Sequence, residues 1–91
     1  VKINFSKIQY IESLSDYIKI HLIEKTITTR ETISNLEARL PQYQFLRVHR
    51  SFIISINKIE LFTNEFVEVG KKAIPISRTY KADVLKKLES L

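Results

Sequence analysis

The sequence predicts a mainly β fold with one short internal helix and one amphipathic helix at the C-terminus. Residue types that suit pleated strands, namely Ile, Val, Thr, Phe and Tyr, account for 34 of its 91 residues. Apolar and polar residues alternate with a period of two in the N-terminal half, whereas the last residues repeat at helical spacing. A chain of this length forms one domain, and because it has no cysteine, core packing alone must stabilise it.

Three strands are expected in the first third of the chain. The clearest covers residues 17–23, where Ile18 and Ile20 alternate with polar residues and define one apolar face. Residues 8–13 form a second strand, joined to the first by a polar turn, and the β-branched residues 26–29 form a third.

The second half contributes a further strand and a hairpin. The apolar run 52–56 is typical of an internal strand. Residues 65–69 and 72–76 predict two strands that turn at Gly70-Lys71, the position of the single glycine.

Two stretches have helical spacing instead. Residues 32–40 carry apolar side chains at i, i+3 and i+7, which predicts a short helix that Pro41 ends. From Thr79 to the C-terminus, apolar residues recur every three or four positions, so we expect an amphipathic helix with Ser77 or Thr79 as its N-cap.

The net charge of +5 is concentrated in two segments that contain no acidic residue. Residues 44–59 hold +3 and residues 69–82 hold +4. Such blocks are typical of a surface that binds a polyanion, although a general solubilising charge would give the same total. Three of these cations are arginines, whose planar fork binds phosphate or guanine through two hydrogen bonds, and this favours the polyanion.

Four polar residues directly precede the apolar strand 52–56: Arg47, His49, Arg50 and Ser51. At the rim of a rigid sheet they are well placed for recognition. For Arg47 the alternative is an internal ion pair with a carboxylate such as Glu12, and for His49 it is a half-buried, hydrogen-bonded position.

Catalysis is disfavoured. His49 and Ser51 share a face if they lie on a strand, but no nearby acid would orient the imidazole and no glycine-rich elbow exposes the serine. Two histidines without cysteine also disfavour a metal site. We therefore expect no enzymatic activity, no metal and no cofactor.

Two junctions before the expected helices are candidate phosphate sites. Arg78 stands where the last strand meets the C-terminal helix, whose free N–H groups and dipole favour an anion. Arg30 and Thr32 stand in the same relation to the first helix. The junction at Arg78 is the better candidate for reading a base, because the arginine side chain projects from the same helix N-terminus that favours the phosphate.

Together these motifs resemble the LytTR family, the LytR/AlgR-type DNA-binding domains of bacterial response regulators. The run Phe45-Leu46-Arg47-Val48-His49-Arg50-Ser51-Phe52 is the most specific part, and residues 11–21, 29–41 and 74–80 match in the family's order. The resemblance implies an elongated fold of antiparallel sheets that reads the DNA major groove through loops. It implies base-reading positions at Tyr17, Arg50 and Arg78, and backbone contacts at Arg30, Thr32, His49 and Ser51. Outward-facing or basic residues add further candidate backbone contacts: Lys19, Lys58, Thr79 and Lys81.

The expected function is sequence-specific binding of double-stranded DNA by a cytoplasmic two-component transcriptional regulator. Residues 1–91 would be the C-terminal DNA-binding domain of a longer protein whose receiver or sensor part is absent, and no segment for a membrane is expected. The resemblance suggests paired direct-repeat sites, with a homodimer formed on DNA or through the absent part. The alternative is a β-rich protein-interaction or ligand-sensing module whose basic face meets an acidic partner.

Overall fold

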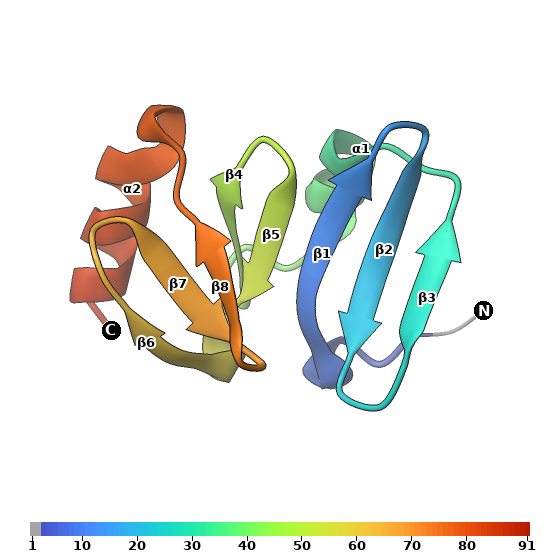
Figure 1. The fold of residues 1–91 in the computed structure, drawn as a ribbon, viewed down its shortest axis with the longest axis horizontal. Helices are drawn as coiled ribbons and strands as arrows, with labels where there is room; N and C mark the ends of the chain where they lie inside the picture. The colour runs from blue at the N-terminus through green and yellow to red at the C-terminus, as the bar shows by residue number, and fades with distance from the viewer. Residues whose placement is uncertain (1–2) are drawn as a thin grey trace.

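In the part of the chain that the structure describes, two antiparallel sheets and two helices make up the fold (Figure 1). The structure is a computed structural model that describes residues 3–91. The larger sheet has the strand order β3-β2-β1-β5-β4, with bounds β1 (Ile8–Leu14), β2 (Tyr17–Leu22), β3 (Thr26–Thr29), β4 (Phe45–His49) and β5 (Phe52–Ser55). The smaller sheet has the order β6-β7-β8, with bounds β6 (Ile59–Phe62), β7 (Phe66–Val69) and β8 (Lys72–Pro75). The helices are α1 (Ile33–Arg39) and α2 (Arg78–Glu89), and 3-10 turns occupy η1 (Phe5–Lys7) and η2 (Ile56–Lys58).

The predicted mainly β fold with one short internal and one C-terminal helix is confirmed. Every predicted strand and helix is present within two residues of its expected bounds. Two strands, β4 and β6, were not predicted. In β4 the pairing register shifts between Arg47 and His49, and this irregularity interrupts the alternation that marks a strand in sequence. Strand β6 is short, and apolar residues occupy three of its four positions, so its sequence shows no clear alternation.

The turn between β7 and β8 explains the position of the single glycine. Gly70 and Lys71 are the two loop residues between the paired Val69 and Lys72, and both have positive φ, 57° and 65°. Positive φ at both central residues defines the type I′ turn, whose twist matches that of the flanking strands. A Cβ atom at Gly70 would lie 2.8 Å from Gln9 Oε1, so this turn also packs closely against the beginning of β1.

The larger sheet is buried on both faces, and this gives the molecule two cores. Adjacent residues of β5 show the division, because Ile53 and Ile54 belong to different cores. The first core joins the larger sheet to the smaller sheet and α2, and its main members are Tyr10, Val48, Ile54, Val67, Val69, Ile74, Ile76, Val84 and Leu88. The second lies beneath α1, and its main members are Ile8, Ile11, Ile18, Ile20, Ile33, Leu40, Phe45 and Ile53.

Truncation of a central core residue should destabilise the whole domain. Ile11 is fully buried on the middle strand of the larger sheet. We expect Ile11→Ala to lower the free energy of unfolding by about 2–5 kcal/mol, because it removes apolar contacts and leaves a cavity. The matched variant Ile23→Ala, at a residue that is 53% exposed, should change it by less than about 0.5 kcal/mol. Urea denaturation measures both, and equal effects would contradict the assigned core.

Candidate nucleic-acid interface

Four connections between strands and helices lie along the same long edge of the molecule, the upper edge in Figure 1. They are the β1–β2 turn, the β3–α1 connection, the β4–β5 turn and the β8–α2 connection, which we call the loop edge. It contains the three predicted base-reading residues, Tyr17, Arg50 and Arg78, although they are far apart in sequence. The molecule measures 34 × 24 × 22 Å, and the loop edge extends along the longest of these dimensions (Figure 1).

Main-chain hydrogen bonds join the loops to one another. The Ser13 N–H at the end of β1 donates to the Ser51 carbonyl in the β4–β5 turn, at 2.8 Å. The Ser77 N–H before α2 donates to the Val48 carbonyl in β4, at 3.0 Å. The β4–β5 hairpin is therefore bonded to the loop on either side of it, and all three loops are held as one unit.

The two predicted base-reading arginines are free to meet a ligand. Arg50 and Arg78 are both exposed. Within residues 3–91 neither guanidinium makes a hydrogen bond or an ion pair. An arginine side chain in this state keeps its five N–H donors for a partner outside the chain.

The β1–β2 turn presents an aromatic ring beside a cation. Tyr17 is 45% exposed, and the Arg30 guanidinium lies 5.5 Å from the centre of its ring. Leu14, directly opposite Tyr17 in the strand register, is 39% exposed and adds an apolar surface that the sequence analysis did not identify. Lys19 follows two residues later on the same strand face, where it is half-buried.

His49 lies in the interior of its turn. Its Nδ1 accepts a hydrogen bond of 3.0 Å from the Ser51 N–H, and its ring packs edge-on against Phe52 with 5.5 Å between ring centres. This is the half-buried, hydrogen-bonded position that the sequence left open for His49. Because Nδ1 is an acceptor, a neutral ring carries its proton on Nε2, and that N–H group can still donate to a ligand.

The N-terminus of α1 is capped by its own side chains. The Thr32 hydroxyl accepts a hydrogen bond of 3.1 Å from the Asn35 N–H, and the Glu31 carboxylate accepts one of 2.9 Å from the Thr32 N–H. Glu31 also accepts a hydrogen bond from the Asn35 side chain and one from Arg39. An acidic residue therefore occupies part of the predicted phosphate clamp, and Arg30 is left as its exposed cation.

The N-terminus of α2 begins at one of the two predicted N-cap residues, Ser77. Ser77 occupies the N-cap position, but its side chain makes no capping hydrogen bond, and its hydroxyl is buried without a partner among the described residues. Thr79, the other predicted N-cap residue, lies inside the helix and is exposed. Lys81 lies one turn along the helix, with its Nζ 3.5 Å from Glu65 Oε1.

The structure divides the two acid-free charge blocks of the sequence. Lys58 follows the end of β5 that is remote from the β4–β5 turn, and Lys71 and Lys72 lie at the β7–β8 turn beside the start of β1. These three lysines occupy the edge opposite the loops (Figure 1). Lys58 is therefore not grouped with the other predicted contacts, and the two blocks do not form one continuous surface.

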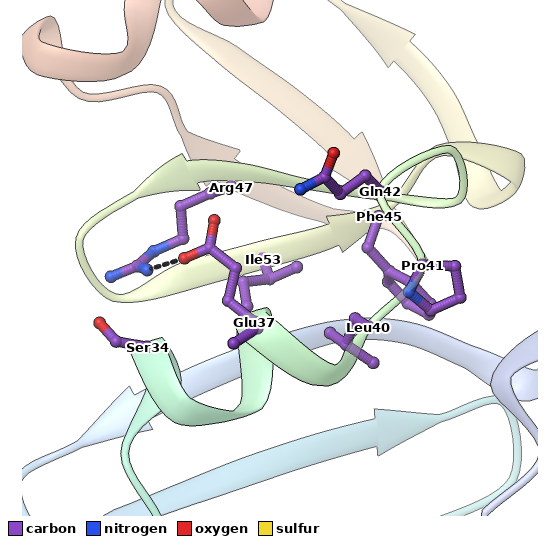
Figure 2. A pocket seen from close by; sticks show the side chains of 9 residues that line it. Ser34, Glu37, Leu40, Pro41, Gln42, Phe45, Arg47 and Ile53 are labelled. Carbon is purple, nitrogen blue, oxygen red and sulfur yellow. Dashed lines mark hydrogen bonds and ion pairs between the residues drawn. The ribbon is translucent and has the colours of Figure 1, made fainter.

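Arg47 has an internal ion pair, but with a different partner from the one considered in the sequence. Its Nη1 lies 2.6 Å from Glu37 Oε1 on α1, as Figure 2 shows. Glu12 instead lies 3.2 Å from His21 Nε2, in the directly paired strand β2. Sequence distance gave no guide to either ion pair, since one depends on how α1 packs against the larger sheet and the other on how β1 and β2 pair within it.

Two further features of the described residues concern metal-ligating side chains and membrane-crossing helices. Within residues 3–91 no three histidine, aspartate or glutamate side chains gather as metal ligands would. In the same range neither helix has the length and apolar character needed to cross a bilayer.

Comparison with known proteins gives a consistent result. A family model described as the LytTr DNA-binding domain matches residues 1–89. The sensory transduction protein LytT of Bacillus anthracis is 38% identical over 97% of this chain and 38% of its own length, and LytT of Bacillus subtilis is 33% identical over 97% of this chain and 39% of its own. A solved LytTr DNA-binding domain from Bacillus cereus superimposes with a TM-score of 0.84 at 28% identity, over all of this chain and 88% of that one. The chain thus spans about two fifths of the length of these curated relatives.

The cap at Glu31 should make part of the stability depend on pH. The hydrogen bond from the Thr32 N–H lowers the pKa of Glu31 below its usual 4.5, and the bonds from Asn35 and Arg39 act in the same direction. A carboxyl whose pKa is lower in the folded state adds stability above its unfolded pKa and loses it as the pH falls. Wild type should therefore be more stable than Glu31→Gln at pH 7, and the difference in Tm should shrink below pH 4.5. A Tm difference that stays constant down to pH 3 would contradict this.

Proposed function

The chain belongs to the LytTr DNA-binding domain family, and from this membership we propose that it binds double-stranded DNA sequence-specifically as part of a bacterial transcriptional regulator. The observation that best supports the proposal is the loop edge. The three proposed base-reading residues lie in or directly beside three separate connections of this edge, and main-chain hydrogen bonds join those connections to one another.

The dimensions of the loop edge suit a DNA duplex. The loops follow one another along the 34 Å axis of the molecule, which is about the length of one turn of B-form DNA. A domain that lies along the duplex can therefore place its outer loops in successive parts of the major groove. The central β4–β5 turn then faces the same side of the duplex between them, where Arg50 can reach a base edge.

Different side chains serve affinity and specificity in this arrangement. Arg50 and Arg78 reach base edges, for which guanine O6 and N7 are the best-matched acceptors of a guanidinium fork. Tyr17 and Leu14 supply aromatic and apolar surface, which suits a thymine methyl group. Phosphate contacts come from the remaining polar groups of the loop edge and its neighbouring strand: Lys19, Arg30, Thr32, His49, Ser51, Thr79 and Lys81. Lys58 lies outside this proposed interface because of its place on the opposite edge.

The wider setting follows from the relatives. The LytT proteins are more than twice as long as this chain, and they are named as sensory transduction proteins. We propose that this domain is the DNA-binding part of a cytoplasmic response regulator whose other part receives the signal. Two copies would occupy paired direct-repeat sites and associate on the DNA or through the other part of the protein.

Loss of one base-reading arginine should reduce specificity. After a bound duplex has been selected from a random pool with the wild-type chain, Arg78→Ala should weaken binding to it by about 1–3 kcal/mol and relax preference at one base pair. The reason is that a bidentate contact to a base edge is lost while the phosphate contacts remain. Fluorescence anisotropy with the selected duplex and with each of its single-base variants measures both effects.

The matched control is Arg39→Ala, which removes another exposed arginine, from the C-terminal end of α1. It should leave both affinity and base preference unchanged. If Arg78→Ala weakens binding to selected and random duplexes equally, Arg78 is only a phosphate contact.

Salt should weaken binding steeply. The three cations among the proposed phosphate contacts, Lys19, Arg30 and Lys81, correspond to a fall of roughly 40-fold in affinity between about 50 and 200 mM salt, because bound cations displace condensed counterions. Lys81→Gln should reduce the slope of log affinity against log salt concentration by about one contact, whereas Lys58→Gln should not change it. A flat salt profile for the wild-type chain would contradict nucleic-acid binding itself.

A further inference from the structure

Arg47 carries a permanent charge in a nearly enclosed position. Its side chain is only 10% exposed, on an edge strand beside the loop edge. A buried guanidinium is costly unless its charge and its N–H groups all find partners. The partners of Arg47 therefore indicate what the residue contributes to the structure.

The guanidinium contacts three separate parts of the molecule. Its Nε donates to the His49 carbonyl at 2.7 Å, and its Nη2 donates to the Arg50 carbonyl at 2.5 Å. Its Nη1 donates to the Glu37 carboxylate on α1 at 2.6 Å (Figure 2). Its carbon atom Cζ also lies 5.6 Å from the centre of the Tyr80 ring, in the first turn of α2.

These contacts converge on the turn that presents Arg50. Two consecutive carbonyls, one before Arg50 and one belonging to Arg50 itself, accept from the same guanidinium, so the peptide plane on each side of Arg50 is held. The register irregularity between Arg47 and His49 brings these carbonyls within reach of the side chain. Tyr80 stands two residues beyond Arg78, so the same group also touches the helix turn that carries the second base-reading arginine.

We propose that Arg47 is a positioning residue for sequence recognition. It does not contact DNA; it fixes the peptide planes from which Arg50 projects and couples that turn to α1 and to the start of α2. This inference rests on the proposed function, since it concerns how Arg50 reads its base pair. In physical terms, the preference for one base pair depends on Arg47, a side chain that does not touch the DNA.

The geometry requires arginine rather than any cation. A planar fork donates in several fixed directions at once, whereas a lysine ammonium is a point charge that can keep the ion pair with Glu37 but cannot hold both carbonyls at these angles. Arg47→Lys therefore keeps the positive charge and removes the fixed hydrogen bonds to the two carbonyls, so it tests the positioning role alone. The exposed pair of Arg39 and Glu31 offers a matched control, because Arg39→Lys makes the same change in an ion pair that holds no base-reading turn.

The test measures affinity for the selected duplex, for its single-base variants and for a random duplex. We expect Arg47→Lys to weaken binding to the selected duplex about 5- to 10-fold, the size of coupling within one hydrogen-bond network, with less than about twofold change on random duplex. The loss of discrimination should be confined to the base pair at which Arg50→Ala also loses it. In the double variant Arg47→Lys/Arg50→Ala, the effect at that base pair should equal that of Arg50→Ala alone. Arg39→Lys should bind as wild type does.

Other outcomes would overturn the proposal. If Arg47 has a purely structural role, Arg47→Lys should lose the same affinity on every duplex, or its loss should add to that of Arg50→Ala. If Arg47→Lys discriminates between base pairs as wild type does, the planar guanidinium is unnecessary. If Arg47→Lys does not fold, Glu37→Ala provides the second variant, because it removes the acceptor that anchors the guanidinium on α1 and should weaken discrimination at the same base pair. If the wild-type chain selects no duplex, the proposed function fails first, so the two failures are distinguishable.

Discussion

The structure depends most on the β4–β5 hairpin, through which the recognition loops are connected. Its main chain bonds to the end of β1 through Ser51 and to the beginning of α2 through Val48, and its own turn presents Arg50. Each of these hydrogen bonds joins segments that are distant in sequence. Each therefore fixes the position of one loop relative to another, which no single strand or helix can do. A loop recognition surface usually gains precision from its scaffold, and here the loops are also joined directly to each other.

This arrangement explains why both faces of the larger sheet must be covered. One core attaches α2 and the smaller sheet, and the other attaches α1, so two separate packing layers carry the helix starts to the same edge. Arg47 lies where these layers meet the hairpin, with α1 on one side and Tyr80 of α2 on the other. The cost of enclosing its charge is offset by three hydrogen bonds, one of which is also the ion pair with Glu37, and the turn gains a fixed conformation.

The features that could be predicted from the sequence are those that depend on the pattern of neighbouring residues. Alternation located β2, and the single glycine located the type I′ turn at Gly70-Lys71. It did not predict β4, because the register irregularity breaks the alternation, nor the partner of Arg47, because Glu37 comes near only when α1 packs. The charge blocks show the same limit. They are continuous in sequence, but antiparallel strands return every few residues to the opposite edge, so Lys58 and Arg50 belong to different edges.

The central claim is that one edge of this domain reads DNA. Backbone amide chemical shifts of the isotope-labelled chain, measured by NMR before and after addition of a selected duplex, test it most directly. The largest changes should fall at the β1–β2 turn, the β4–β5 turn and the β8–α2 connection, with little change around the β2–β3 and β7–β8 turns. Changes concentrated around Lys58 and the β7–β8 turn would contradict the account, because they would place DNA on the opposite edge.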